Sequence, residues 1–399
     1  MTTSTQQRGR GGRRMDPKYV KRRQRGLAVL IASLVLLIGA VIYIGVQISG
    51  GGETVADRDY RGSGNGVYQL VEIPEGSSVS QLGPELEERG IVKTDSAFQT
   101  AAANNPDAGN IQPGFYRLQG EMSAAAAVQA LLDPANRVEL LDIHGGSTLL
   151  DVTVVGGSTR PGIYSQISRV TCTEGSTNCI SAAELEQVGA NADLVSLGVP
   201  EWAREAVAAR GNDPKRLEGL IVPGQYVVNP ELDAEGIITD LITRSARQFN
   251  DTGIVERARA LELTPYELLT AASLVEREAP AGDFDKVARV ILNRLEEPMR
   301  LEFDSTVNYG LPDVEVATTD EDRAMVTPWN TYAKDGLPET PIAAASMEAI
   351  TAMENPAEGN WLFFVTVDQD GTTVFNDTFE EHLADVQQAL ESGVLDTNR

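Results

Sequence analysis

The pattern of hydrophobic and polar positions divides the chain into one long uncharged run and a series of shorter helices and strands. Residues 27–49 contain no charged side chain and are predominantly apolar. Residues 50–66 are polar and rich in glycine, which is typical of a flexible linker. From residue 67 onward, segments with helical periodicity and segments with strand-like alternation follow one another. This mixture predicts an α+β fold beyond the linker, ending in a short tail at 391–399.

The uncharged run at 27–49 is long enough to cross the roughly 30 Å hydrocarbon core of a bilayer as a single helix. A cleaved signal peptide is the alternative, but the run is longer than a usual signal core and no clear Ala-x-Ala pattern follows it. Residues 1–26 carry nine lysines and arginines against Asp16 alone. Because positive charge stays on the cytoplasmic side, we predict a single-pass cell-membrane protein with a cytoplasmic N-terminus and an extracytoplasmic body.

Composition narrows the chemistry of this 399-residue chain, whose formal net charge is -25. Because the negative charge lies outside the basic tail, nucleic acid is not an expected partner of the body. Cys172 and Cys179 are predicted to form a disulfide in an exported domain, with two free thiols as the alternative. The two histidines do not lie in a metal-ligand spacing and no Gly-x-Ser-x-Gly elbow is present, so no metal site and no serine hydrolase site is expected.

Residues 67–135 predict a small module in the order strand, helix, helix, strand. The strands are expected at 68–73 and 115–118, and a capping box from Ser78 to Gln81 begins the first helix. Further helices are expected over 93–104 and 124–132. This order resembles a LysM-like βααβ module, a fold that recognises glycans containing N-acetylglucosamine; a spacer domain is the alternative. Residues 136–216, which include the Cys172–Cys179 loop, show no chemistry and are assigned as a connecting region.

The most informative stretch begins at Thr264, where Thr-Pro-Tyr-Glu combines a capping box with proline at the first helical position. The helix should run to about Ala279 and stop before Pro280. Its apolar residues fill a wide arc, and Glu276 and Glu278 fall on opposite sides of that arc. A carboxylate on the buried side of a helix needs a partner or a function. Because residues two apart do not face one pocket, we expect one glutamate to work in a cleft and the other to be structural.

Several motifs follow one another in a fixed order across residues 217–390. They are SLVEREA at Ser273–Ala279, VARVILNRL at Val287–Leu295, the Asp304 to Tyr309 string, Asn330-Thr331-Tyr332, Gly336-Leu337-Pro338 and WLFFV at Trp361–Val365. In this order they resemble the catalytic domain of the endolytic murein transglycosylases, the YceG-like family. The resemblance is strong over 217–390, moderate over 67–135 and poor between them. It implies a mixed α+β catalytic domain at 217–390.

The resemblance also implies a reaction and its site residues. Such enzymes cleave the β-1,4 bond between N-acetylmuramic acid and N-acetylglucosamine inside peptidoglycan strands, without water, and leave a 1,6-anhydromuramoyl end. One carboxylate suffices because the sugar's own 6-hydroxyl attacks, so Glu276 is the expected catalytic residue and no cofactor is implied. Asp304, Asn330 and Tyr332 are expected to bind substrate. Glu278 is expected to be structural, as a buried ion-pair partner of the following helix at Arg289 or Arg294.

The implied partners are peptidoglycan glycan strands, the membrane through residues 27–49, and the peptidoglycan synthases or division proteins that act where strands are made. The implied role is to terminate the elongation of nascent strands. One departure stands out: the family usually continues Gly-Leu-Pro with Pro-Gly-Pro-Ile, whereas this chain has Glu339-Thr340-Pro341-Ile342. Two alternatives therefore stay open, namely an inactive membrane-anchored scaffold that binds peptidoglycan, and a muramidase that hydrolyses the same bond with water.

Overall fold

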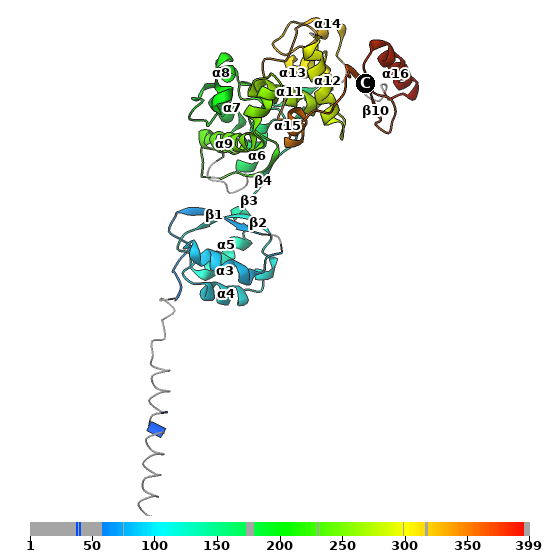
Figure 1. Cartoon of the computed structure of the whole chain (residues 1–399). Coiled ribbons are helices and arrows are strands. Elements are labelled where there is room, and N and C mark those ends of the chain that lie inside the picture. The colour runs from blue at the N-terminus through cyan, green and yellow to red at the C-terminus, as the bar shows by residue number, and fades with distance from the viewer. Residues whose placement is uncertain are drawn as a thin grey trace, which may run out of the picture.

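The computed structural model of the chain describes Leu37, Ile38 and Ala40 together with residues 58–74, 76–172, 179–229, 231–297, 299–315 and 318–394. The basic tail and nearly all of the predicted membrane span at 27–49 lie outside these described residues. Within the described ranges, no helix is both long enough and apolar enough to cross a membrane. The described residues from 58 to 394 form two units, each built around a hydrophobic core of its own (Figure 1).

The smaller unit is an antiparallel sheet with helices packed on one side of it, as Figure 1 shows. Its elements in chain order are β1 (Tyr68–Ile73), α3 (Val79–Glu88), α4 (Asp95–Ala103), η1 (Ala108–Asn110), β2 (Gly114–Gln119), α5 (Ala124–Leu132), η2 (Pro134–Asn136) and β3 (Arg137–Val138). The strand order is β1-β2-β3, and Val71 lies opposite Tyr116. The capping box from Ser78 to Gln81 forms. The predicted order of strand, helix, helix and strand is therefore confirmed.

The larger unit combines helices with several small sheets. Its first half contains β4 (Leu140–Ile143), β5 (Val152–Val154), β6 (Ser158–Arg160), α6 (Ile163–Thr171), α7 (Ala182–Asn191), α8 (Glu201–Ala209), β7 (Gly224–Val227) and α9 (Ala234–Thr252). Its second half contains α10 (Ile254–Ala260), α11 (Pro265–Glu278), α12 (Phe284–Glu296), α13 (Asp304–Gly310), β8 (Asp313–Val314), α14 (Asp320–Ala324), α15 (Met347–Glu354), β9 (Phe363–Thr366), β10 (Thr373–Asn376) and α16 (Phe379–Ser392). The protein is thus a mixed α+β protein, as predicted.

The strands of the larger unit pair across long sequence separations. β4 pairs antiparallel with β7, so that Leu141 lies opposite Tyr226. β5 pairs antiparallel with β6 and parallel with β8, which joins residues near 153 to residues near 313. β9 and β10 form an antiparallel hairpin. These pairings bring the chain before residue 216 against the chain that follows it.

Helix α11 is the central element of the larger unit. It begins as predicted, because the Thr264 side chain accepts from the Glu267 amide while the Glu267 carboxylate accepts from the Thr264 amide. It packs against α8, α10, α12, α13 and α15. Leu268, Leu269 and Leu274 are all 0% exposed. Truncating a leucine buried in this way to alanine costs about 2–5 kcal/mol.

The small polar residues of α11 are buried as well. Thr270 is 1% exposed and Ser273 is 0% exposed. The Ser273 hydroxyl accepts a hydrogen bond from the Ile342 amide at 3.0 Å and donates to the Thr270 carbonyl at 2.6 Å. The segment 341–346 therefore lies along this face of the helix and carries its backbone toward Glu276.

Residues 136–216 share the core of α11. Leu141 of β4, Ile167 of α6 and Val207 of α8 are each 0% exposed and belong to one buried cluster with Leu268. The Cys172–Cys179 disulfide is present at the end of α6, with Cα atoms 4.3 Å apart. Because β4 is fixed in this core, the turn that follows it lies against the C-terminal end of α11. The segment expected only to connect two domains thus supplies one wall of the candidate site.

Candidate active site

A cavity of about 730 Å³ lies beside the C-terminal end of α11. Its walls come from the turn after β4, from β5, β6 and α6, from the segment before β7 and from α13. Gly145, Arg160, Lys215, Glu218 and Arg277 are among the lining residues. Ligand-binding clefts in proteins have volumes of about 300–1,000 Å³, so the cavity is large enough to receive part of a glycan strand.

Glu276 is half-buried and lies at the edge of this cavity, in contact with Gly145 and next to Arg277 in the chain, both of which line the cavity. Its Oε2 accepts a hydrogen bond of 2.9 Å from the amide of Ser346, the N-cap residue of α15. Its Oε1 faces Gly145, where an added β-carbon would lie 2.0 Å from that oxygen. A side chain at position 145 would therefore displace the carboxyl group from this position. A carboxyl group with one oxygen held by a backbone donor and the other against a glycine of the cavity wall is suited to giving and taking a proton.

Glu218 was not expected at the site, although it lines the cavity and is 1% exposed. Each of its oxygens lies 3.2 Å from the Leu149 amide, and the Tyr309 hydroxyl donates to Oε2 at 2.8 Å. Burial raises the pKa of Glu218 to about 7, against the opposing effects of these hydrogen bonds and of the Lys215 charge. The sequence contains one hint of this burial, since Glu218 stands in the apolar run from Leu217 to Val222.

Lys215 completes this buried polar group. Its Nζ donates to the Tyr309 carbonyl at 3.0 Å and lies 4.3 Å from the centroid of the Tyr309 ring. Burial lowers the pKa of Lys215. The chain from Gly145 to Leu149 consequently touches Glu276 at one end and Glu218 at the other. It links the Glu276 carboxyl group to that of Glu218, which lines the cavity.

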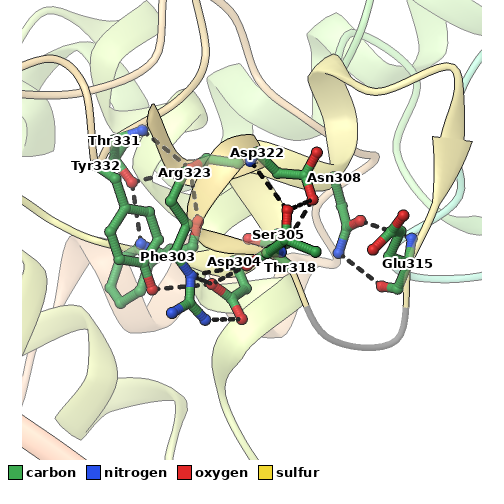
Figure 2. Close-up of polar contacts among 12 residues, drawn as sticks. Phe303, Asp304, Ser305, Asn308, Glu315, Thr318, Asp322, Arg323, Thr331 and Tyr332 are labelled. Atoms are coloured by element: carbon green, nitrogen blue, oxygen red, sulfur yellow. Dashed lines mark hydrogen bonds and ion pairs between the residues drawn. The ribbon is translucent and has the colours of Figure 1, made fainter. Parts of the chain in front are cut away.

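Asp304 and Tyr332, which were both predicted to bind substrate, lie together (Figure 2). The Tyr332 hydroxyl donates to Asp304 Oδ1 at 2.9 Å. Arg323 forms an ion pair with Asp304 Oδ2 at 3.0 Å, and the Thr318 hydroxyl donates to Oδ1 at 2.8 Å. Burial, followed by the charge of Asp304, raises the pKa of Tyr332. The Asp304 side chain is 40% exposed, so this polar group keeps a face open to solvent.

Asn330 takes a different place from the one expected. It is 1% exposed, and its side-chain amide donates to the carbonyl groups of Asp322, Arg323 and Met325. Its Oδ1 accepts from the Tyr332 amide at 2.9 Å. All of its polar atoms are used within the loop, which argues against the predicted contact with substrate. Asn330 instead fixes the loop that carries Arg323 and Tyr332.

Glu278 does not form the predicted ion pair. Its Oε1 accepts from the Ser305 amide at 3.2 Å, in the first turn of α13. Among the described residues, no ion pair joins it to Arg289 or Arg294, which both donate to backbone carbonyl groups within 357–362 at 2.7 Å. A backbone amide in the first turn of α13 is therefore the partner of Glu278, in place of the predicted arginine. Burial raises the pKa of Glu278.

The fold and the site together define a class of protein, namely mixed α+β proteins in which a buried central helix presents a glutamate at the edge of a polar cavity. This chain belongs to the YceG-like family, whose model matches residues 71–388. The family indicated by the sequence motifs is thereby confirmed. The match also includes residues 136–216, which contribute the turn beside Glu276.

Proteins similar to this chain include two named endolytic murein transglycosylases. The one from Bacillus subtilis (strain 168) is 29% identical over 314 residues, which cover 78% of this chain and 82% of that protein. The one from Streptococcus pneumoniae serotype 2 (strain D39 / NCTC 7466) is 27% identical over 334 residues, which cover 82% of this chain. This chain spans only 59% of the streptococcal protein's length. A crystal structure of a YceG-like protein from Listeria monocytogenes is similar with a TM-score of 0.50 at 25% identity, covering 79% of this chain and 98% of that one.

Proposed function

We propose that this protein is an endolytic peptidoglycan lytic transglycosylase. It cleaves the β-1,4 bond between N-acetylmuramic acid and N-acetylglucosamine and leaves a 1,6-anhydromuramoyl end. The observation that carries the proposal is the half-buried Glu276 at the edge of the cavity, in a chain of the YceG-like family whose relatives are named endolytic murein transglycosylases. The reaction is the elimination of one sugar from its neighbour, and water is not consumed.

In the proposed mechanism Glu276 acts twice. As a general acid, its carboxyl proton passes to the glycosidic oxygen while the bond from that oxygen to C1 of the muramoyl residue breaks. The leaving N-acetylglucosamine then carries a free 4-hydroxyl group. As a general base, the resulting carboxylate takes the proton of the muramoyl 6-hydroxyl while that oxygen bonds to C1. The carboxyl group is protonated again at the end, so one residue serves where glycosidases that use water need two carboxylates.

Two of the predicted substrate contacts are retained in the proposal. Tyr332 and Asp304 are held against each other and keep an exposed side, which suits stacking on a sugar ring and hydrogen bonding to its hydroxyl groups. Asn330 supports them from within the loop. Glu278 remains structural in the proposal, as the acceptor for the first turn of α13.

The cellular setting is also a proposal. Residues 27–49 anchor the chain in the cell membrane with the catalytic unit outside, which the uncharged run and the basic tail before it support. The small unit acts as a LysM-like module, which its strand, helix, helix, strand order supports. Held at the membrane beside peptidoglycan synthases or division proteins, the enzyme cuts nascent strands and so terminates their elongation.

Product analysis tests the proposed reaction. The full-length protein in detergent micelles is incubated with uncrosslinked glycan strands, and the new chain ends are identified by mass spectrometry. Anhydromuramoyl ends that appear with the wild type and not with Glu276→Gln support the proposal. Reducing muramic acid ends would instead show a hydrolytic muramidase. Binding of strands without any new ends would show an inactive scaffold.

A further inference from the structure

Two arginines on the walls of the cavity lie beside the candidate catalytic group. Arg277 follows Glu276 directly on α11, and Arg160 is the last residue of β6; both line the same cavity. Arg277 lies over the turn after β4, where a β-carbon added to Gly146 would be 3.4 Å from its Nη1. Consecutive residues of the helix, Glu276 and Arg277, therefore contact consecutive glycines of one turn.

Neither arginine is held in a salt bridge within the part of the chain that the structure describes. Among the described residues, no carboxylate forms an ion pair with Arg160 or with Arg277. Desolvation at the cavity wall and then the positive charge of Arg160 lower the pKa of Arg277, while the charges of Glu278 and Glu276 oppose this change, so the two guanidinium groups lie close enough to repel each other. Both arginines are exposed on the cavity wall, so their guanidinium groups are open to an anion that enters the cavity.

The other charged groups that line the cavity already have partners, with one exception. Lys215 is held by Tyr309, and Glu218 accepts from Leu149 and Tyr309. Asp151 accepts from the Gly162 amide at 2.7 Å. Asp142 lies 4.0 Å from His144 Nε2. The exception is Arg169 of α6, which forms no ion pair with the residues that the structure describes and adds a third positive charge to the same walls. A planar anion is the ligand that such a set of guanidinium groups recognises best.

We propose that Arg160 and Arg277 form a carboxylate-binding subsite that holds the acidic group on the lactyl arm of the muramoyl residue. The inference rests on the proposed function, and it deepens that function by naming the chemical class of the substrate. The carboxylate belongs either to the peptide attached to the lactyl group or, where the peptide has been removed, to the lactyl group itself. Both sources offer the same chemistry to the arginines.

The placement of the two functions matches the shape of the substrate. The lactyl arm and the scissile bond belong to the same muramoyl ring, because the arm is attached at C3 and the bond leaves from C1. Glu276 and Arg277 are likewise adjacent at the end of one helix. When the guanidinium groups hold the carboxylate, the ring is oriented with its glycosidic oxygen toward Glu276. The subsite thus selects muramoyl residues over N-acetylglucosamine, which has no acidic arm.

The test compares Arg160→Gln and Arg277→Gln with the wild type on three sets of soluble glycan oligomers of equal length. The first set carries peptides with free carboxylates, the second carries peptides whose carboxylates are all converted to amides, and the third has had its peptides removed to leave lactyl carboxylates. The full-length protein is assayed by the yield of anhydromuramoyl ends. Arg244→Gln is the matched control, because Arg244 pairs with Asp240 on α9 and does not line the cavity.

We expect Arg160→Gln to raise the KM for the free-carboxylate oligomers about ten-fold with kcat unchanged, since charge-assisted hydrogen bonds are lost from binding. Arg160→Lys should recover part of the affinity, and Arg244→Gln should behave as the wild type. On the amide oligomers, the wild type should bind as weakly as Arg160→Gln. A loss on the peptide-free oligomers as well would place the lactyl carboxylate in the subsite, whereas a loss confined to the peptide-bearing set would place a peptide carboxylate there.

The subsite is overturned if both glutamine variants keep the wild-type KM on the charged oligomers, or lose as much on the amide oligomers. Binding measured in the Glu276→Gln background separates this outcome from failure of the proposed function. There, Arg160→Gln should weaken binding of the charged oligomers about ten-fold without any turnover. Should the wild type make no anhydromuramoyl ends, the reaction is wrong, and this binding difference still decides whether the subsite exists.

Discussion

The buried carboxyl group of Glu218 should make the stability of the larger unit depend on pH, and one substitution should remove that dependence. Glu218→Gln keeps the shape of the side chain. Its amide oxygen still accepts from the Tyr309 hydroxyl or the Leu149 amide, which are the partners of the carboxyl group. What the substitution removes is the possibility of a negative charge at a position that is 1% exposed.

The magnitude follows from the shift in pKa. Burial raises the pKa of Glu218 from 4.5 to about 7, so the folded protein retains a proton that the unfolded chain releases between these values. Stability from this group is therefore fully present below about pH 4.5 and is lost as the pH rises through about 7. A shift of this size corresponds to about 3 kcal/mol in total, of which about 2.5 kcal/mol falls between about pH 5 and pH 8.

The assay is denaturant unfolding followed by tryptophan fluorescence. All three tryptophans, Trp202, Trp329 and Trp361, lie in the larger unit, so the signal reports that unit alone. Relative to the wild type, Glu218→Gln should gain about 2.5 kcal/mol of unfolding free energy between about pH 5 and pH 8. Taking the difference between variants cancels the titration of all other groups. The exposed Glu205 on α8 offers the control, since Glu205→Gln also removes one negative charge.

Parallel curves of stability against pH for the wild type and Glu218→Gln would refute this reasoning. They would mean that Glu218 is charged in the folded protein, with Lys215 and the hydrogen bonds from Leu149 and Tyr309 compensating fully for its burial. If instead Glu218→Gln lost unfolding free energy relative to the wild type as the pH rises, the folded carboxyl group would have a lowered pKa.

Three further substitutions test the packing around the site. Gly145→Ala should lower turnover about a hundred-fold by displacing the Glu276 carboxyl group, while Gly109→Ala, where an added β-carbon meets open space, should not change it. Glu278→Ala leaves the amide of Ser305 without its acceptor and should lower the unfolding free energy by about 1–3 kcal/mol; unchanged melting with lost turnover would make Glu278 catalytic instead. Asp304→Asn removes the ion pair with Arg323 and should cost about 1 kcal/mol in stability, which thermal unfolding would detect, and its KM for glycan should rise more than its kcat falls.

Elements set by local chemistry were predictable from the sequence. Helix α11 begins at its capping box and ends before Pro280, as expected. α3 likewise begins at its predicted capping box, and α5 lies at its predicted bounds. In each of these, a cap, a turn or a clear period acts within a few residues. The order of motifs is equally a property of the linear sequence, and it was sufficient to indicate the family.

The misses share a different cause, which is dependence on distant parts of the chain. Taken alone, the sequence up to Tyr309 favours an extended segment, yet Asp304–Gly310 is a helix, too short to show a period of its own. The apolar run 220–222 favours a short strand by its composition, but the strand β7 begins at Gly224, where β4 is available to pair with it. A short segment takes its conformation from its neighbours in space, and those neighbours are far away in the sequence.

The candidate site shows the same division. Glu276 could be singled out because its position on an amphipathic helix and its motif agree. Its surroundings could not be predicted in this way. Gly145 lies more than a hundred residues before Glu276 in the chain, and Ser346 lies seventy residues after it. Glu218 and the cavity depend on residues 136–216, in which no chemistry was visible. Burial, which gives Glu218 its raised pKa, is a property of the assembled core rather than of the local sequence.

The identity of the new chain ends tests the central claim most directly. Uncrosslinked glycan strands are digested with the full-length protein and with Glu276→Gln, and the products are resolved by mass spectrometry. The two possible products differ by one water molecule, so the masses are unambiguous. We expect 1,6-anhydromuramoyl ends with the wild type and none with Glu276→Gln. Reducing muramic acid ends from the wild type, or anhydromuramoyl ends made at the full rate by Glu276→Gln, would contradict the claim.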